Sequence, residues 1–172
     1  NPDMPAEGVE RAAYRAQKFG SVERGAELDA QVAEAGRAAG LTFRHELMTR
    51  TPNTVEAHRL IRLAGSSGLQ HALVGRLFQA YFQEGEDIGD RTVLARLGAE
   101  VGLPQDMLEA FSAGEAARQE VMMESLGLSQ AGINGVPSFL LDRHLLFSGA
   151  MPGERMAEAF RQAVAILRSR AA

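Results

Sequence analysis

Hydrophobic residues recur at intervals of three and four along most of the chain, in short segments separated by glycine, proline or a capping residue. This spacing predicts amphipathic helices, because positions i, i+3, i+4 and i+7 share one helix face. The predicted helices cover about residues 10–19, 21–36, 53–64, 69–82, 91–101 and 115–130, with a short one entered at Pro104 and a last one at about 154–168. Residues 7–130 are therefore expected to be nearly all helical.

Asn53 is the predicted N-cap of the third of these helices. Glu56 follows three residues later, as in a capping box, where the cap and the acidic side chain each accept a backbone N–H. Pro52, directly before Asn53, fits a chain that is entering a helix. As a cap alone, Asn53 would need no further function.

Two short apolar runs near the C-terminus predict a β-hairpin. The segment Gly135-Val136-Pro137-Ser138-Phe139 is typical of a helix exit, a proline turn and the start of a buried strand that continues to Leu141. A second run, at 145–149, follows across residues 142–144, and the last helix closes the chain. The pattern thus indicates one compact α-rich body with a small hairpin.

Length and charge exclude several classes of protein. The 172 residues suffice for one globular domain, or for one domain with a large insertion. The net charge of −4 provides no basic patch, so we expect no nucleic-acid partner. No apolar run approaches the roughly 18 residues of a membrane span. Residues 1–5 do not look like a signal peptide, so a cytoplasmic location is expected.

The sequence contains no cysteine. Disulfides and thiolate metal sites are therefore excluded within these residues. His45, His71 and His144 are scattered, with no spacing typical of a metal site. We expect neither a metal nor a resident cofactor.

Five motifs in register resemble the DsbA family of thioredoxin-like proteins, in particular its FrnE-type and 2-hydroxychromene-2-carboxylate isomerase branch. They cover the whole chain in the family's order. They are Asn1-Pro2-Asp3-Met4-Pro5, Pro52-Asn53-Thr54 with Ala57-His58-Arg59-Leu60, Asp87-Ile88-Gly89-Asp90, Gly132 to Phe139, and Phe147 to Pro152.

The resemblance implies an α/β, thioredoxin-like fold whose C-terminal half accompanies a large all-α insertion. Residues 1–6 would end an incomplete thioredoxin-like domain, 7–130 would form the helical insertion, and 131–172 would form the C-terminal half. Family members begin with a strand and a Cys-Pro-Trp-Cys motif or a Ser-containing equivalent, and this sequence holds neither. The implied activity is thiol–disulfide oxidoreduction or isomerisation, with this chain inactive by itself because it has no thiolate.

The same resemblance implies the site residues. Pro137 would be the family's cis-proline, although a trans proline at an edge strand would also explain it, and Val136 would pair its backbone with an extended substrate. Asn53 would lie across the cleft. Ser148 and Gly149 precede the last helix, whose N–H groups attract a carboxylate.

Two further residues are weaker candidates. His58 lies five positions after Asn53 and Asn134 lies in the proline loop. A structural hydrogen bond would equally explain His58.

Alternative functions stay open at this point. One is a glutathione-dependent isomerase or transferase of the 2-hydroxychromene-2-carboxylate isomerase or kappa type, with glutathione as cosubstrate. The other is a non-catalytic helical binding module. The expected partner is a thiol- or disulfide-bearing protein or peptide, and the unpaired edge of Phe139–Leu141 predicts a possible homodimer.

Overall fold

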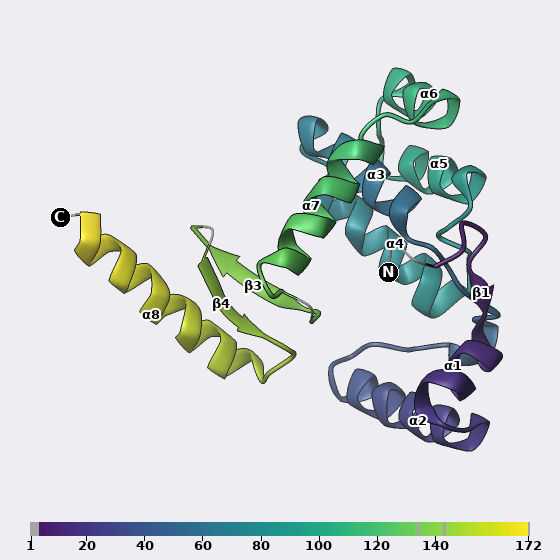
Figure 1. The fold of residues 1–172 in the computed structure, drawn as a ribbon, viewed down its shortest axis with the longest axis horizontal. Coiled ribbons are helices and arrows are strands. Elements are labelled where there is room, and N and C mark those ends of the chain that lie inside the picture. Colours follow the sequence, from purple (N-terminus) through teal and green to yellow (C-terminus); the bar gives the residue numbers. More distant parts are fainter. Residues whose placement is uncertain (1–3, 134, 143, 172) are drawn as a thin grey trace. The chain divides into compact units, whose positions relative to one another are not determined.

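The computed structural model describes residues 4–133, 135–142 and 144–171. They form two compact units, divided between Met123 and Glu124. The described residues are mostly helical, with two small antiparallel sheets (Figure 1).

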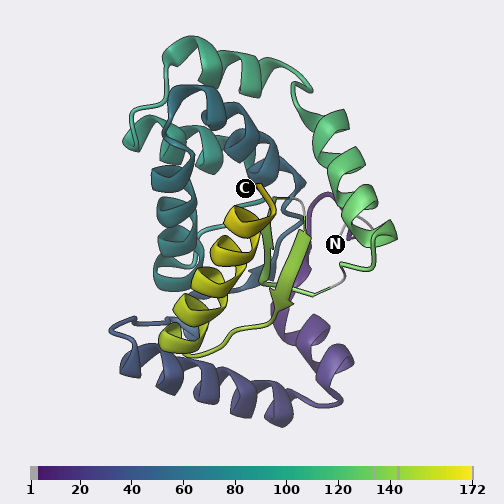
Figure 2. The same ribbon diagram turned by 90° about the vertical axis from the view of Figure 1, so that its left-hand side faces the viewer.

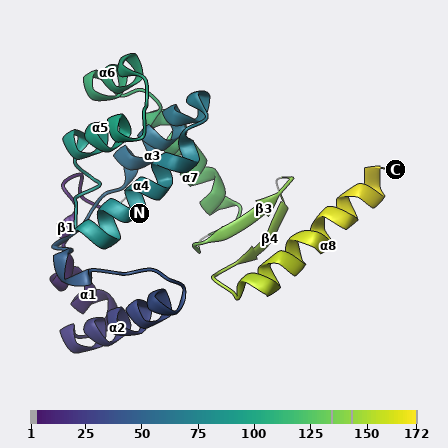
Figure 3. The same cartoon turned by 180° about the vertical axis from the view of Figure 1, so that it is seen from behind.

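Four helices enclose the core of the first unit: α3 (Val55–Leu63), α4 (Gln70–Glu84), α5 (Arg91–Glu100) and α6 (Gln105–Ala113). They gather into one bundle (Figure 3). The apolar stripes that predicted the helices face inward, and several of their side chains have no exposed surface: Leu60, Leu73, Leu94, Leu97 and Phe111. A 3₁₀ turn, η2 (Ala64–Ser67), joins α3 to α4.

A helical hairpin precedes this bundle in the chain. It consists of α1 (Arg11–Phe19) and α2 (Val22–Ala38), and Ser21 caps α2 by accepting the Arg24 N–H at 3.1 Å. Strand β1 (Val9–Glu10) pairs with β2 (Arg50–Thr51), and η1 (His45–Leu47) lies between α2 and β2. Asp29 on α2 accepts hydrogen bonds or ion pairs from Arg11 at 2.9 Å and Arg15 at 2.8 Å, so a largely buried charge pairing joins α1 to α2.

The second unit contains a hairpin and a long helix. Strands β3 (Ser138–Leu141) and β4 (His144–Ser148) pair antiparallel, with an irregularity between Phe139 and Leu140. Helix α8 (Gly153–Ala171) lies along this hairpin (Figure 2) and places Phe160 against the rings of Phe139 and Phe147 at 5.9 and 5.7 Å. Helix α7 (Arg118–Gln130) begins in the first unit and ends in the second.

Several sequence expectations need correction. Asn53 does not occupy the N-cap position: α3 starts at Val55 with Thr54 as its cap, and Glu56 forms ion pairs in place of a capping box. Glu10, expected inside the first helix, belongs to β1. The strand Phe139–Leu141, expected to be buried, is only half-buried, and Leu140 is 40% exposed.

Gly85 supplies a test of packing in the first unit. It ends α4 at φ 71°, and a Cβ there would lie 2.5 Å from the carbonyl oxygen of Leu47. Gly68 has a similar φ of 73°, with nothing within 4 Å of such a Cβ. Both positions carry the left-handed strain of about 1–2 kcal/mol for an alanine, and only Gly85 adds a clash.

We therefore expect Gly85→Ala to lower the free energy of unfolding in urea by about 1–3 kcal/mol more than Gly68→Ala does, since a backbone segment must shift. Equal losses in the two variants would show that the turn around Leu47 does not pack against the end of α4.

Candidate functional site

The loop that enters β3 is the first part of the candidate site. The Val136–Pro137 peptide bond is cis, the isomer that the loop sequence suggested. The Ser138 hydroxyl donates to the carbonyl oxygen of Gly135 at 2.6 Å and also contacts the Ser148 hydroxyl at 2.8 Å. The second unit thus holds the loop by contacts from the facing ends of both strands.

Ser148 and Gly149 lie beside this loop. Ser148 is the register partner of Ser138, and the N–H of Gly149 donates to the carbonyl of Pro137 at 2.8 Å. That N–H is therefore occupied by the protein itself, and it does not form part of a free helix terminus, because α8 begins only at Gly153. The two residues support the loop, which the sequence argument did not foresee.

Val136 is the exposed point of the loop. It is 94% exposed, and its backbone forms no hydrogen bond with another residue of the described part of the chain. Asn134, also predicted for this site, lies outside the described residues.

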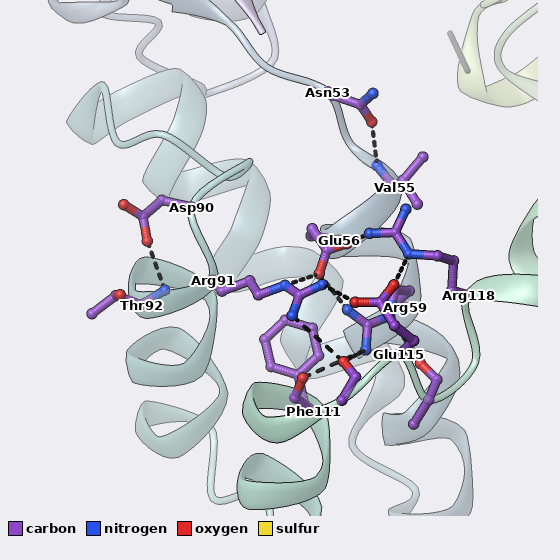
Figure 4. A network of polar contacts seen from close by, with 12 residues as sticks. Asn53, Val55, Glu56, Arg59, Asp90, Arg91, Thr92, Phe111, Glu115 and Arg118 are labelled. Atoms are coloured by element: carbon purple, nitrogen blue, oxygen red, sulfur yellow. Dashed lines mark hydrogen bonds and ion pairs between the residues drawn. The ribbon is translucent and has the colours of Figure 1, made fainter. Parts of the chain in front are cut away.

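Asn53 belongs to the first unit. Its Oδ1 accepts the N–H of Val55 at 3.0 Å (Figure 4), and its Nδ2 donates to the carbonyl of Met4 at 2.7 Å. Both ends of the amide are thus engaged, which fixes the orientation of the side chain. His58 lies on the exposed side of α3, and its backbone N–H donates to Thr54 at 3.0 Å.

A carboxylate one turn further along α3 organises the first unit near Asn53. Glu56 forms ion pairs with Arg59, Arg91 and Arg118 (Figure 4). Arg91 and Arg118 are the first residues of α5 and α7, so three helix starts meet at one carboxylate. Because helix N-termini carry partial positive charge, Glu56 in the first turn of α3 also balances the dipole of that helix.

Arg59 is the buried member of this group. Its side chain has no exposed surface, and it donates to the carbonyls of Gly114 at 2.7 Å and Ala116 at 2.9 Å. Its guanidinium also lies 5.1 Å from the centre of the Phe111 ring. A buried charge is tolerated only when paired and hydrogen-bonded, and each of these contacts meets that need.

Glu115 extends the group toward solvent. It accepts from Arg91 at 2.5 Å and from Arg118, and the hydrogen bond from Arg91 is the main cause that lowers the pKa of its carboxyl. The carboxylate stays ionised at neutral pH and keeps the group close to charge balance. Sequence reasoning missed this group, because Glu56 fitted a capping box and Arg59 was considered only as part of a family motif.

A shallow hollow of about 510 Å³ also opens in the first unit, lined by Glu7, Arg50, Asp87 and Asp90 among others. Arg50 is held there by Asp87 at 3.7 Å. No group of three or more His, Cys, Asp and Glu side chains suited to a metal occurs among the described residues. Within the same residues, no helix is long and apolar enough to cross a membrane.

Comparison with known proteins places these features in context. A family model described as a DSBA-like thioredoxin domain matches residues 1–163. An uncharacterized protein, YwbO, from Bacillus subtilis is 34% identical over 97 residues, which cover 55% of this chain and 45% of that protein. The chain thus spans less than half the length of this curated relative.

The chain is also similar to solved structures. A probable DsbA oxidoreductase from Streptomyces coelicolor superposes with a TM-score of 0.82 at 28% identity, covering 95% of this chain and 71% of that one. The cytosolic disulfide reductase DsbM from Pseudomonas aeruginosa, solved with GSH, gives a TM-score of 0.53 at 28% identity, covering 70% and 61%.

Glu56→Gln tests the charge group. The amide would turn an N–H₂ toward arginine donors and leave buried Arg59 without its counter-ion, so we expect about 3 kcal/mol or more of lost stability in chemical unfolding. Glu158→Gln, which removes an exposed pair with Arg161 on α8, is the matched control and should leave the midpoint unchanged. Similar midpoints for both variants would contradict the role assigned to Glu56.

Proposed function

Because this chain belongs to the family of DSBA-like thioredoxin domains, we propose that it carries the substrate-binding part of a FrnE-type thiol–disulfide oxidoreductase or isomerase. The chain has the family's thioredoxin-like fold with a helical insertion. In this proposal residues 1–6 and 131–172 are thioredoxin segments and 7–130 is the insertion. The substrate is a protein or peptide that bears a thiol or a disulfide.

The exposed peptide group of Val136 is the observation that carries the proposal. Pro137 on one side and Gly135 on the other have their carbonyls held by the second unit, whereas Val136 is 94% exposed between them. An extended peptide can bind such a backbone as an added strand, through main-chain hydrogen bonds that do not depend on its sequence. Substrate breadth of this kind suits an enzyme that acts on many polypeptides.

The thiol chemistry requires groups that this sequence does not contain, since it has no cysteine. We propose that a Cys-x-x-Cys motif in a longer protein supplies them. The thiolate of its first cysteine attacks one substrate sulfur, the S–S bond breaks, and the other substrate sulfur leaves as a thiolate. The thiolate of the second cysteine then attacks the mixed disulfide, which releases the reduced substrate and leaves the motif oxidised.

Asn53 is a further part of the proposal. Asn53 would contact the substrate backbone with amide hydrogen-bonding positions beyond those used for Val55 and Met4, because an amide offers four in all.

The location in the cell is another part of the proposal. A cytosolic site of action is supported by the similarity to a reductase described as cytosolic.

Glutathione is the second candidate substrate. The similarity to a disulfide reductase solved with GSH favours it. Ala150-Met151, next to Gly149, provides no charged side chain for the γ-glutamyl end, which favours a polypeptide. Comparing turnover of a peptide disulfide with that of glutathione disulfide distinguishes the two.

Insulin reduction tests the proposal. We expect the longer protein to reduce insulin with a dithiol as electron source, and the 172-residue chain to stay at the buffer background because it holds no thiolate. Val136→Pro in the longer protein removes the Val136 N–H and also fixes φ at this position. It should lower kcat/KM for a peptide disulfide by about three- to tenfold, the effect of one hydrogen bond.

Val136→Ala is the matched control, because it shortens the side chain and keeps the N–H. It should retain kcat/KM within about twofold, and thermal melts would verify that both variants fold. An inactive longer protein would refute the oxidoreductase assignment, and equal losses in the two variants would refute the backbone pairing.

A further inference from the structure

Two hydroxyl groups lie between the ends of β3 and β4, next to the exposed peptide of Val136. Ser138 Oγ is 2.6 Å from the Gly135 carbonyl oxygen and 2.8 Å from Ser148 Oγ. Ser148 was expected to bind substrate, but here its hydroxyl contacts the protein itself. The two contacts form a chain of hydrogen bonds whose direction can be assigned.

A serine hydroxyl has one proton to donate and two lone pairs that accept. Ser138 uses its proton for the carbonyl of Gly135, because a carbonyl can only accept. In the contact between the two hydroxyls, Ser148 must therefore be the donor and Ser138 the acceptor. The chain runs from Ser148 through Ser138 to Gly135, and hydrogen bonds in such a chain strengthen one another.

The last hydrogen bond of this series, from Ser138 to the Gly135 carbonyl, fixes the orientation of the peptide plane between Gly135 and Val136. The carbonyl of Gly135 and the N–H of Val136 belong to one trans peptide unit, in which the two groups point in opposite directions. Since the carbonyl points toward Ser138, the N–H of Val136 points away from it. The Pro137 carbonyl is held separately by the Gly149 N–H at 2.8 Å, so both flanks of Val136 are anchored.

We propose that Ser148 is a positioning residue, which acts through Ser138 and Gly135 to orient the Val136 N–H toward an extended substrate. The importance of this N–H for substrate rests on the function proposed above. The geometric claim, that Ser148 orders the Val136 peptide, can be tested on the chain itself.

The first test is ¹⁵N relaxation of the 172-residue chain. In Ser148→Ala we expect the order parameter of the Val136 amide to fall from about 0.85 to below about 0.6. Ser148→Thr keeps the hydroxyl and should restore the wild-type value. Ser169→Ala, which removes a hydroxyl bonded to Ile166 in α8, is the matched control and should change nothing at Val136.

Ser138→Ala removes the middle hydroxyl of the same hydrogen-bond series. It should therefore lower the order parameter of the Val136 amide as well. Cross-strand contacts between Leu141 and His144 report whether the hairpin stays folded in each variant. An unchanged Val136 order parameter in Ser148→Ala, or a loss in Ser148→Ala that Ser138→Ala does not reproduce, would overturn the proposal.

The second test measures turnover of a peptide disulfide by the longer protein. Ser148→Ala should raise KM by about three- to tenfold with kcat within about twofold, since only binding geometry changes. Ser148→Thr should return KM to the wild-type value. An unchanged KM would overturn the positioning role, whereas an inactive wild type would count against the proposed function and leave the relaxation result to decide the geometry.

Discussion

The burial of the Arg59 guanidinium is the constraint on which the first unit depends. A charge without exposed surface needs a counter-ion and acceptors, and Arg59 obtains them from Glu56 one turn earlier and from the carbonyls of Gly114 and Ala116. These contacts tie the start of α3 to the segment between α6 and α7. Glu56 in turn pairs with Arg91 and Arg118, the first residues of α5 and α7, so one ion group joins these two helices to the start of α3.

The second unit depends on a smaller constraint of the same kind. Two carbonyls of the loop before β3, those of Gly135 and Pro137, need hydrogen-bond donors. The Ser138 hydroxyl donates to the first and the Gly149 N–H donates to the second. Val136 lies between these two carbonyls and stays exposed to solvent, and its peptide group forms no hydrogen bond within the described residues. A loop with satisfied flanks and a free centre can bind an extended chain without first breaking internal hydrogen bonds. The main feature of the proposed site is therefore its backbone, and no particular side chain.

Much of the fold could be predicted from sequence, because helix periodicity and capping are local. The helices predicted after Ser21 and Asp90 form with these residues as their N-caps, and the hairpin before the last helix forms. The exposed Val136 also lies in the predicted loop. The ion group could not be predicted, since Arg91 and Arg118 reach Glu56 from 35 and 62 positions away. The Ser138–Ser148 contact was missed for a related reason: strand register decides it, and one residue of slip would separate the hydroxyls.

We propose that this chain binds polypeptide through the loop at Val136 without any thiol. The most direct measurement is a titration of the ¹⁵N-labelled chain with an unfolded, cysteine-free polypeptide, followed by amide chemical shifts. We expect saturable shifts centred on Gly135, Val136 and Ser138, with the Val136 amide moving in the direction of a newly formed hydrogen bond. Shifts confined to the helices of the first unit, or no saturable shift at all, would contradict it.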